Sequence, residues 1–191
     1  AYDAAGNVSV QSASVNGTTQ IAISVSTGST TYYVSTTGND SNPGTQSLPW
    51  RNIAYATCAA AYNCPIQTSN PNRLKAGDTL YIRGGTYVEH GILFANSGTL
   101  GNPITVKSFP GETAVIDGGY TVASGRNPVF EIDGVHYITL DSLTIRRGST
   151  INIALAYNRA TTNITIQNSD IKEFIFFDNS ANIYVGTSGA N

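Results

Sequence analysis

The chain repeats one ten-residue pattern at an offset of 26 residues, first as His136-Tyr-Ile-Thr-Leu-Asp-Ser-Leu-Thr-Ile145 and then as Thr162-Asn-Ile-Thr-Ile-Gln-Asn-Ser-Asp-Ile171. The apolar positions of the two copies coincide: Ile138 with Ile164, Leu140 with Ile166, and Ile145 with Ile171. Alternation of apolar and polar residues is typical of a strand with one buried face. A repeat of this length with a constant apolar phase indicates a solenoid, in which each coil buries its apolar side chains against its neighbours.

Further strand-like segments, separated by Gly, Asn, Asp and Ser, lie on both sides of the repeat. The full set is 79–83, 103–107, 114–117, 129–133, 137–141, 163–167 and 182–185. We interpret 182–185 as the next copy of 163–166, so the expected period is uneven. Variable turns between stacked strands suit a right-handed parallel β-helix. A β-sandwich of alternating strands is the alternative, but the segments after residue 79 lack clear hairpin turns.

Composition divides the chain into three regions. Residues 1–30 form a Ser/Thr-rich arm, and residues 31–191 are the expected β-helix domain, with a turn-rich region at 31–78 followed by coils at 79–191. In the turn-rich region Tyr32-Tyr-Val-Ser35 predicts a strand, and Pro49-Trp50 opens a predicted helix that runs to about Ala61.

The arm carries a strong hairpin signal, because Asn16-Gly17 lies between two alternating apolar runs. A lone hairpin is marginally stable in water, so the arm is expected to pair with another segment. The residues that we expect to make this pairing are Val8, Val10, Val15, Ile21, Ile23 and Val25.

The two cysteines, Cys58 and Cys64, have a spacing that fits no common zinc or redox motif. One local disulfide is the economical interpretation, and it implies an oxidising compartment, outside the cell or at its surface. Two buried reduced thiols are the alternative.

Composition excludes some partners. Only 12% of residues are charged and the net charge is −2, so no basic field exists to hold nucleic acid or an anionic membrane. No apolar run approaches the length needed to span a bilayer. The chain contains no Met and no visible signal peptide, from which we expect a processed or trimmed product.

Three segments resemble the opening of secreted pectate-lyase-like β-helix proteins, most of all polysaccharide lyases of the pectate lyase and chondroitinase/alginate lyase kinds. They are Tyr32-Tyr-Val-Ser-Thr-Thr-Gly-Asn-Asp-Ser-Asn-Pro-Gly-Thr45 with Pro49-Trp50, then Leu74-Lys-Ala-Gly-Asp-Thr-Leu-Tyr-Ile-Arg-Gly-Gly-Thr-Tyr87, and Asn96-Ser-Gly-Thr-Leu-Gly-Asn-Pro-Ile-Thr-Val-Lys107 followed by Val115-Ile-Asp-Gly118. The resemblance covers residues 31–145 and implies an all-β, right-handed parallel β-helix whose short N-terminal helix caps the solenoid.

The same resemblance assigns no catalytic or metal-binding residue. In those lyases the calcium-binding carboxylates and the catalytic Lys or Arg lie on later coils than this chain reaches. The first residues, Ala1-Tyr-Asp-Ala-Ala-Gly-Asn-Val-Ser9, resemble instead the closing strand of a fibronectin-type-III or bacterial immunoglobulin-like module.

Arg146, Arg147 and Lys172 are the candidate polysaccharide contacts, because the 26-residue offset stacks Arg146 over Lys172 on successive coils. A lyase needs a cation beside a uronate carboxylate and a base that removes the neighbouring proton. The acidic candidates are Asp133, Asp141, Asp170 and Asp178. We favour the simpler interpretation that these acids end strands at turns and that the bases are solvated. No metal or cofactor is predicted, except calcium if the chain belongs to a lyase.

Three functions remain in competition. The first is a non-catalytic extracellular structural protein that pairs with copies of itself, head to tail, into filaments, because residues 186–191 supply no helix to cover the last coil. The second is the N-terminal fragment of a secreted, calcium-dependent uronate lyase, with acidic polysaccharide as partner. The third is a carbohydrate-binding or adhesin module. The residues themselves do not favour catalysis.

Overall fold

The computed structural model describes residues 29–58, 73–121, 127–156, 159–173 and 181–186. These residues form one short helix, α1 (Ile53–Thr57), and thirteen strands. The strands are β1 (Thr31–Val34), β2 (Thr79–Ile82), β3 (Gly85–Val88), β4 (Ile92–Leu93), β5 (Ile104–Ser108), β6 (Ala114–Asp117), β7 (Phe130–Ile132), β8 (His136–Asp141), β9 (Leu143–Arg146), β10 (Ile151–Leu155), β11 (Thr162–Gln167), β12 (Asp170–Lys172) and β13 (Ala181–Val185). No helix in this described part is long and apolar enough to cross a membrane.

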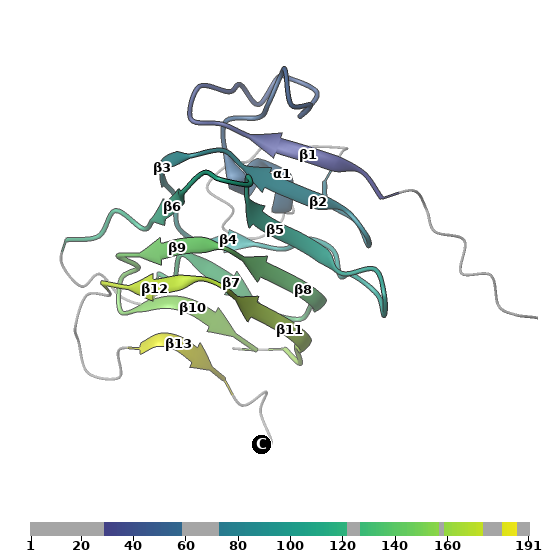
Figure 1. Ribbon diagram of the computed structural model, residues 1–191. Coiled ribbons are helices and arrows are strands. Elements are labelled where there is room, and N and C mark those ends of the chain that lie inside the picture. The colour runs from purple at the N-terminus through teal and green to yellow at the C-terminus, as the bar shows by residue number, and fades with distance from the viewer. Residues whose placement is uncertain (1–28, 59–72, 122–126, 157–158, 174–180, 187–191) are drawn as a thin grey trace, which may run out of the picture.

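The strands form three parallel sheets that run along the molecule as the sides of one stack (Figure 1). Their orders are β1-β2-β5-β8-β11, β3-β6-β9-β12 and β4-β7-β10-β13. From β2 onward each coil contributes one strand to each sheet in the same order, and equivalent strands of successive coils pair with each other; β1 adds a fifth strand to the first sheet. This arrangement confirms the predicted parallel β-helix.

The predicted register is confirmed for the ten-residue repeat. Ile164 pairs with Ile138 and Ile166 with Leu140 in one sheet, and Ile171 pairs with Ile145 in the next. The uneven period has a different origin from the one expected. The partners Thr79, Thr105, Thr139 and Thr165 show coils of 26, 34 and 26 residues. The longer coil takes its extra residues in the turns that join its strands, which leaves the pairing unchanged.

The interpretation of residues 182–185 as a copy of 163–166 is wrong. Strand β13 pairs with β10 in a different sheet, so it is the third side of the coil that begins with β11. Strand β9 was not predicted as a separate strand, because Ser142 alone separates it from β8. Ser142 has a φ of 58°, a left-handed conformation that turns the chain sharply without Gly or Pro. The segments β3, β4, β10 and β12 were missed as well.

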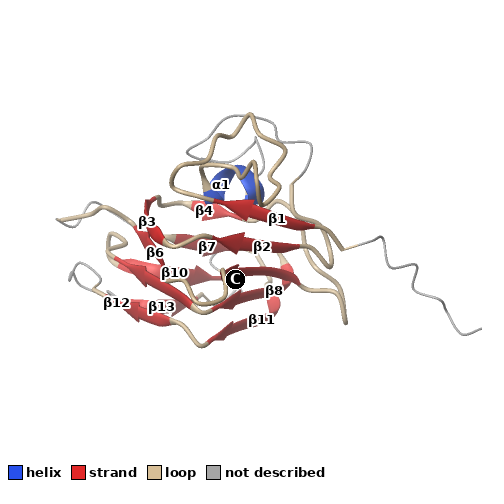
Figure 2. Ribbon diagram, turned by 45° about the horizontal axis from the view of Figure 1, so that its top comes forward, coloured by secondary structure: helices blue, strands red, loops and turns tan. Residues whose placement is uncertain are grey.

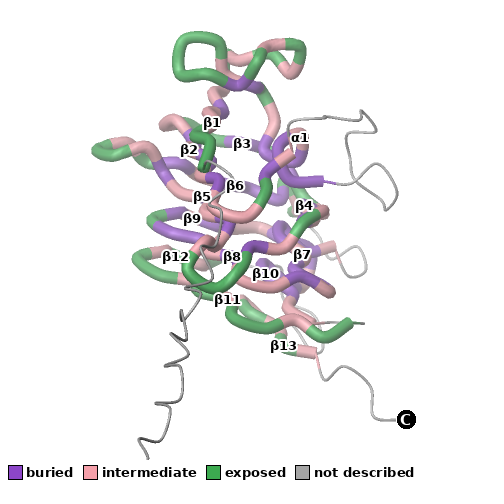
Figure 3. The backbone as a smooth tube through the Cα atoms, turned by 90° about the vertical axis from the view of Figure 1, so that its right-hand side faces the viewer, coloured by how far each residue is buried: buried purple, intermediate pink, exposed green. Residues whose placement is uncertain are grey.

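The core lies inside the coils, where alternate residues of each strand point inward. Fully buried Ile, Leu, Val and Phe side chains from all three sheets form one core. Figure 3 shows buried residues along the strands. Such a continuous apolar column stabilises each coil only through its neighbours, because no coil encloses a core of its own.

The capping helix is shorter than predicted. It begins at Ile53, because Trp50 forms a bridge to Val34 of β1 and donates its N–H to the Tyr33 carbonyl at 2.9 Å. The next two N–H groups donate to Asp40 Oδ1, and the backbone of Asn52 is extended. It ends at Thr57, and the predicted residues 59–61 lie outside the described ones. Figure 2 shows α1 at the end of the stack, beside β1 and β4.

Glu89 holds this helix in place. Its buried carboxylate accepts hydrogen bonds from the backbone N–H groups of Ile53 and Ala54, at 2.9 Å each. Burial raises the pKa of Glu89, and the two hydrogen bonds oppose that rise. The N-terminal N–H groups of a helix have no partner within the helix, so Glu89 satisfies two groups that would otherwise be buried without one.

The inward and outward positions of β9 provide a direct test of the fold. Ile145 is fully buried between Ile116 and Ile171 of the adjacent coils, whereas its neighbour Thr144 points outward. We expect Ile145→Ala to lower the free energy of unfolding by about 2–5 kcal/mol, because it leaves a cavity in the stack. Thr144→Ala, the matched control, is expected to change it by less than about 1 kcal/mol. Urea denaturation measures both, and equal losses would contradict this inward-outward assignment.

Candidate functional site

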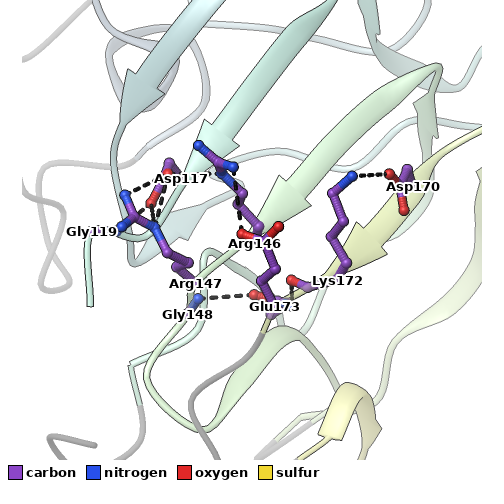
Figure 4. Close-up of polar contacts among 9 residues, drawn as sticks. Asp117, Gly119, Arg146, Arg147, Gly148, Asp170, Lys172 and Glu173 are labelled. Atoms are coloured by element: carbon purple, nitrogen blue, oxygen red, sulfur yellow. Dashed lines mark hydrogen bonds and ion pairs between the residues drawn. The ribbon is translucent and has the colours of Figure 1, made fainter. Parts of the chain in front are cut away.

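A row of polar side chains crosses the outer face of the sheet β3-β6-β9-β12. Asp117, Arg146 and Lys172 are in register on successive coils. Their inward-pointing neighbours are apolar, so strand alternation turns all three outward. Together with Arg147, Asp170 and Glu173 they form the group that we call the charged cluster (Figure 4).

Asp117 is the centre of the charged cluster. Its side chain is 0% exposed, and its carboxylate accepts hydrogen bonds from Arg146 Nε at 2.9 Å, Arg147 Nε at 2.8 Å and the Gly119 N–H at 2.9 Å. Burial alone raises the pKa of a carboxyl, but here the hydrogen bonds from Arg147 and Gly119 and the two guanidinium charges lower the pKa of Asp117. The carboxylate is therefore ionised and orients both arginines.

Backbone geometry brings Arg147 onto Asp117. Arg147 directly follows β9 with a φ of 52°, and its N–H donates to the Glu173 carbonyl of the next coil at 2.9 Å. Glu173 has the same left-handed conformation, with a φ of 54°. Gly118 makes the close approach possible, since a Cβ there would lie 2.3 Å from the Arg147 carbonyl oxygen. The segment Ile116-Asp117-Gly118 thus provides a buried carboxylate and, at the glycine, the room that the Arg147 backbone needs to pass close by.

The remaining pairs of the charged cluster are exposed. Lys172 Nζ lies 2.5 Å from Asp170 Oδ2, and Arg146 lies 3.4 Å from a Glu173 carboxylate oxygen. Exposed ion pairs contribute about 0–1 kcal/mol each, so these two hold their side chains weakly. Asp117 occupies two of the three guanidinium nitrogens of Arg147. Positioned guanidinium groups bind carboxylates through paired N–H donors, which makes this cluster the best candidate for contact with an acidic sugar.

The structure places the predicted basic residues as follows. Arg146 and Lys172 are stacked on successive coils, as the offset predicted. Arg146 and Arg147 are not simply solvated, because both pair with a buried carboxylate that the sequence had not indicated. Asp117 could have been noticed from its offset of 29 residues to Arg146, the same offset that relates β6 to β9.

The three acidic candidates that the structure describes do not meet. Asp133 pairs with Arg159 at 3.1 Å after β7, Asp141 ends β8 on another sheet, Asp170 lies in the charged cluster, and Asp178 lies outside the described residues. Calcium in proteins takes six to eight oxygen ligands. Among the described residues no three His, Cys, Asp or Glu side chains converge, so these acids do not fit a calcium site.

Two predicted groups fall partly or wholly outside the described residues. Cys58 is buried directly after α1, but Cys64 is not described, so the disulfide stays a prediction. The hairpin arm with Val8, Val10, Val15, Ile21, Ile23 and Val25 is not described either, and its pairing and its boundary as a separate region stay predictions.

Removal of the Asp117 charge tests its role as anchor. Asp117→Asn is expected to lower the free energy of unfolding by about 1–3 kcal/mol, because two guanidinium groups lose an ionised partner. Asp170→Asn, the control, removes an exposed partner and is expected to cost less than about 1 kcal/mol. Chemical denaturation compares them, and a small, equal effect of both would show that Asp117 anchors nothing.

Asp141 provides a pH-dependent test. It accepts hydrogen bonds from the Asn168 amide and the Ser142 hydroxyl at 2.9 Å each and pairs with Lys107 at 3.1 Å, and the Asn168 bond contributes most to lowering its pKa to about 2. A depressed pKa stabilises the fold above the usual value of 3.8, and this contribution is lost as the pH falls through about 2.

We therefore expect the wild type to exceed Asp141→Asn in unfolding free energy by about 1–2 kcal/mol at neutral pH, and this excess should shrink on acidification. Denaturation of both proteins from about pH 7 down to about pH 3 measures the difference. A difference that stays constant over this range would contradict the assignment.

Comparison with known protein families and curated proteins shows what this chain is similar to. A family model described as the Pel9A-like right-handed β-helix region matches residues 32–188. Among curated proteins, YwoF of Bacillus subtilis is 36% identical over 115 residues, which is 60% of this chain and 21% of YwoF. Pectate lyase PEL9 of Emericella nidulans is 34% identical over 87 residues, 45% of this chain and 18% of PEL9. The chain thus spans about a fifth of the length of these relatives.

Solved structures share the fold at lower identity. The crystal structure of pectate lyase Pel9A superimposes with a TM-score of 0.58 and 21% identity, over 76% of this chain and 34% of that one. The GH136 lacto-N-biosidase from Eubacterium ramulus gives a TM-score of 0.56 and 18% identity, over 82% and 30%. The family match agrees with the parallel sheets that the structure shows. This chain belongs to the Pel9A-like right-handed β-helix family.

Proposed function

We propose that this chain is part of a secreted polysaccharide lyase that acts on uronate-rich chains of the pectate class. The family match over residues 32–188 carries the proposal, and the 34% identity to a protein named pectate lyase supports the substrate class. The location outside the cell follows from the predicted cysteine pair and is part of the same proposal.

The reaction would be a β-elimination. A base removes the proton beside the uronate carboxylate, the bond to the leaving sugar oxygen breaks, a carbon–carbon double bond forms, and the leaving oxygen takes up a proton. A cation next to the carboxylate stabilises the charge that develops. Calcium would supply such a charge, held by residues other than the described acids.

The charged cluster has a binding role in this proposal. Arg146, Arg147 and Lys172 present guanidinium and ammonium donors on successive coils, where a chain of uronates offers a carboxylate on each sugar. The cluster has three acidic and three basic side chains and therefore no net charge. It would therefore recognise carboxylates by placed donors instead of attracting them from a distance.

The full gene product that contains this chain is the protein to assay. We expect ultraviolet absorbance from unsaturated sugar products with polygalacturonate and calcium, and none after chelation. Lys172→Ala is expected to raise KM several-fold with little change in kcat, since it removes binding that is equal in the ground and transition states. Lys75→Ala, a basic residue outside the charged cluster, is the matched control. Absence of unsaturated product from both pectate and alginate by a folded protein would overturn the proposal.

Self-assembly is the second candidate, and one observation favours it. The N-terminal arm carries two alternating apolar runs around Asn16-Gly17, a sequence pattern that favours pairing with a strand of another copy. Unpaired strand edges are templates for another chain. We propose head-to-tail filaments as the alternative to the lyase.

Electron microscopy and light scattering over a range of concentrations test assembly. Filaments that are lost on deletion of residues 1–28 would support strand donation by the arm, whereas filaments that survive would leave only end-on stacking. Single particles at every concentration would contradict assembly altogether.

A further inference from the structure

The outer face of the sheet β1-β2-β5-β8-β11 carries a row of threonines. One threonine from each of its five strands is in register with the next, and Figure 1 shows these strands one below another. The row consists of Thr31, Thr79, Thr105, Thr139 and Thr165. No hydrogen bond between described residues uses any of the five hydroxyls. Strands lie about 4.8 Å apart, so the row repeats donor-acceptor groups at that interval.

Beside this row lies an aromatic cluster, which consists of Tyr33, Tyr81 and Phe109. Tyr33 and Tyr81 are two residues further along β1 and β2 than the threonines, and Phe109 directly follows β5. The rings of Tyr33 and Tyr81 stack with centroids 5.7 Å apart, and Phe109 meets the Tyr81 ring edge-on at 5.6 Å. All three side chains are half-buried. The rings therefore fix one another's position while part of each remains open to solvent.

Arg83 completes the aromatic cluster. Its guanidinium carbon lies 4.7 Å from the centre of the Phe109 ring, and Glu112 holds it through Nε at 2.9 Å and through a terminal nitrogen at 2.7 Å. This two-point ion pair keeps the guanidinium over the ring. The cluster is thus preorganised, which lowers the entropic cost of binding a ligand.

The charges of this face balance one another. Arg83 pairs with Glu112, and Lys107 pairs with Asp141 at 3.1 Å. A face with no net charge, open rings and a repeating row of hydroxyls does not favour a polyanion. It matches a neutral sugar chain, whose C–H faces pack on aromatic rings and whose hydroxyls exchange hydrogen bonds with threonine.

We propose that this face is a binding site for a neutral polysaccharide of pyranose rings, which runs diagonally across the strands from the aromatic cluster to the threonine row. One sugar ring packs on Tyr33 and Tyr81, and the following rings meet the threonine row. The face is on a different sheet from the charged cluster, so it would hold the protein on a neutral glycan while acidic chains are handled elsewhere. It does not depend on lyase activity.

Affinity electrophoresis in gels with hydroxyethylcellulose, xylan, galactan or polygalacturonate tests the proposal. The expected result is retardation by at least one neutral glycan, weakened about tenfold in Tyr81→Ala, the scale of one lost ring contact of about 1.4 kcal/mol. Thr139→Val keeps the shape but removes one hydroxyl, and it should weaken binding about two- to tenfold. Thr144→Val, an outward threonine of another sheet, should bind as the wild type does.

Several outcomes overturn the site: no retardation by any neutral glycan, an equal loss with Thr144→Val, or wild-type affinity in both Tyr81→Ala and Thr139→Val. If circular dichroism shows that Tyr81→Ala does not fold, Thr139→Val alone decides. Activity on polygalacturonate should be unchanged in Thr139→Val, so failure of this site and failure of the lyase proposal give different results.

Discussion

In-register parallel pairing between coils is the constraint on which this molecule depends. From β2 onward every coil adds one strand to each of three sheets, and a residue shares its inward or outward direction with its partner on the next coil. A slip of one residue would turn all apolar side chains of a strand to the outside. Coils can therefore differ in length only at their turns, as the coils of 26 and 34 residues show.

The same constraint turns sequence repeats into surface rows. Because partners stack at the strand spacing, one residue type repeated at the coil period becomes a line of identical groups, as in the threonine row. Different residues at equivalent positions become contacts, as with Asp117 beneath Arg146. The two outer faces consequently differ in chemistry. One holds ions around a buried carboxylate, and the other combines open rings and hydroxyls with balanced charges.

Corners with left-handed residues direct the side chains of the charged cluster. Such residues recur in equivalent places on successive coils: Tyr137 and Asn163, Ser142 and Asn168, Arg147 and Glu173. At Ser142 the direction of the chain changes within one residue, so β9 starts at once on another sheet. At Arg147 this turn brings the side chain back over Asp117, where a longer loop would carry it away.

The sequence alone determined the class of fold and which face of most strands is buried, because alternation and a 26-residue offset are local patterns that can be counted. It did not reveal β9, since the single-residue corner at Ser142 leaves no Gly or Pro signal. It also misplaced β13, because residues 182–185 resemble 163–166 although they belong to another sheet. Nor did it identify Asp117 as the partner of Arg146 and Arg147, about 30 positions away. Only the stacked coils decide which distant side chains become neighbours, because coil length and corner position act together to set the register.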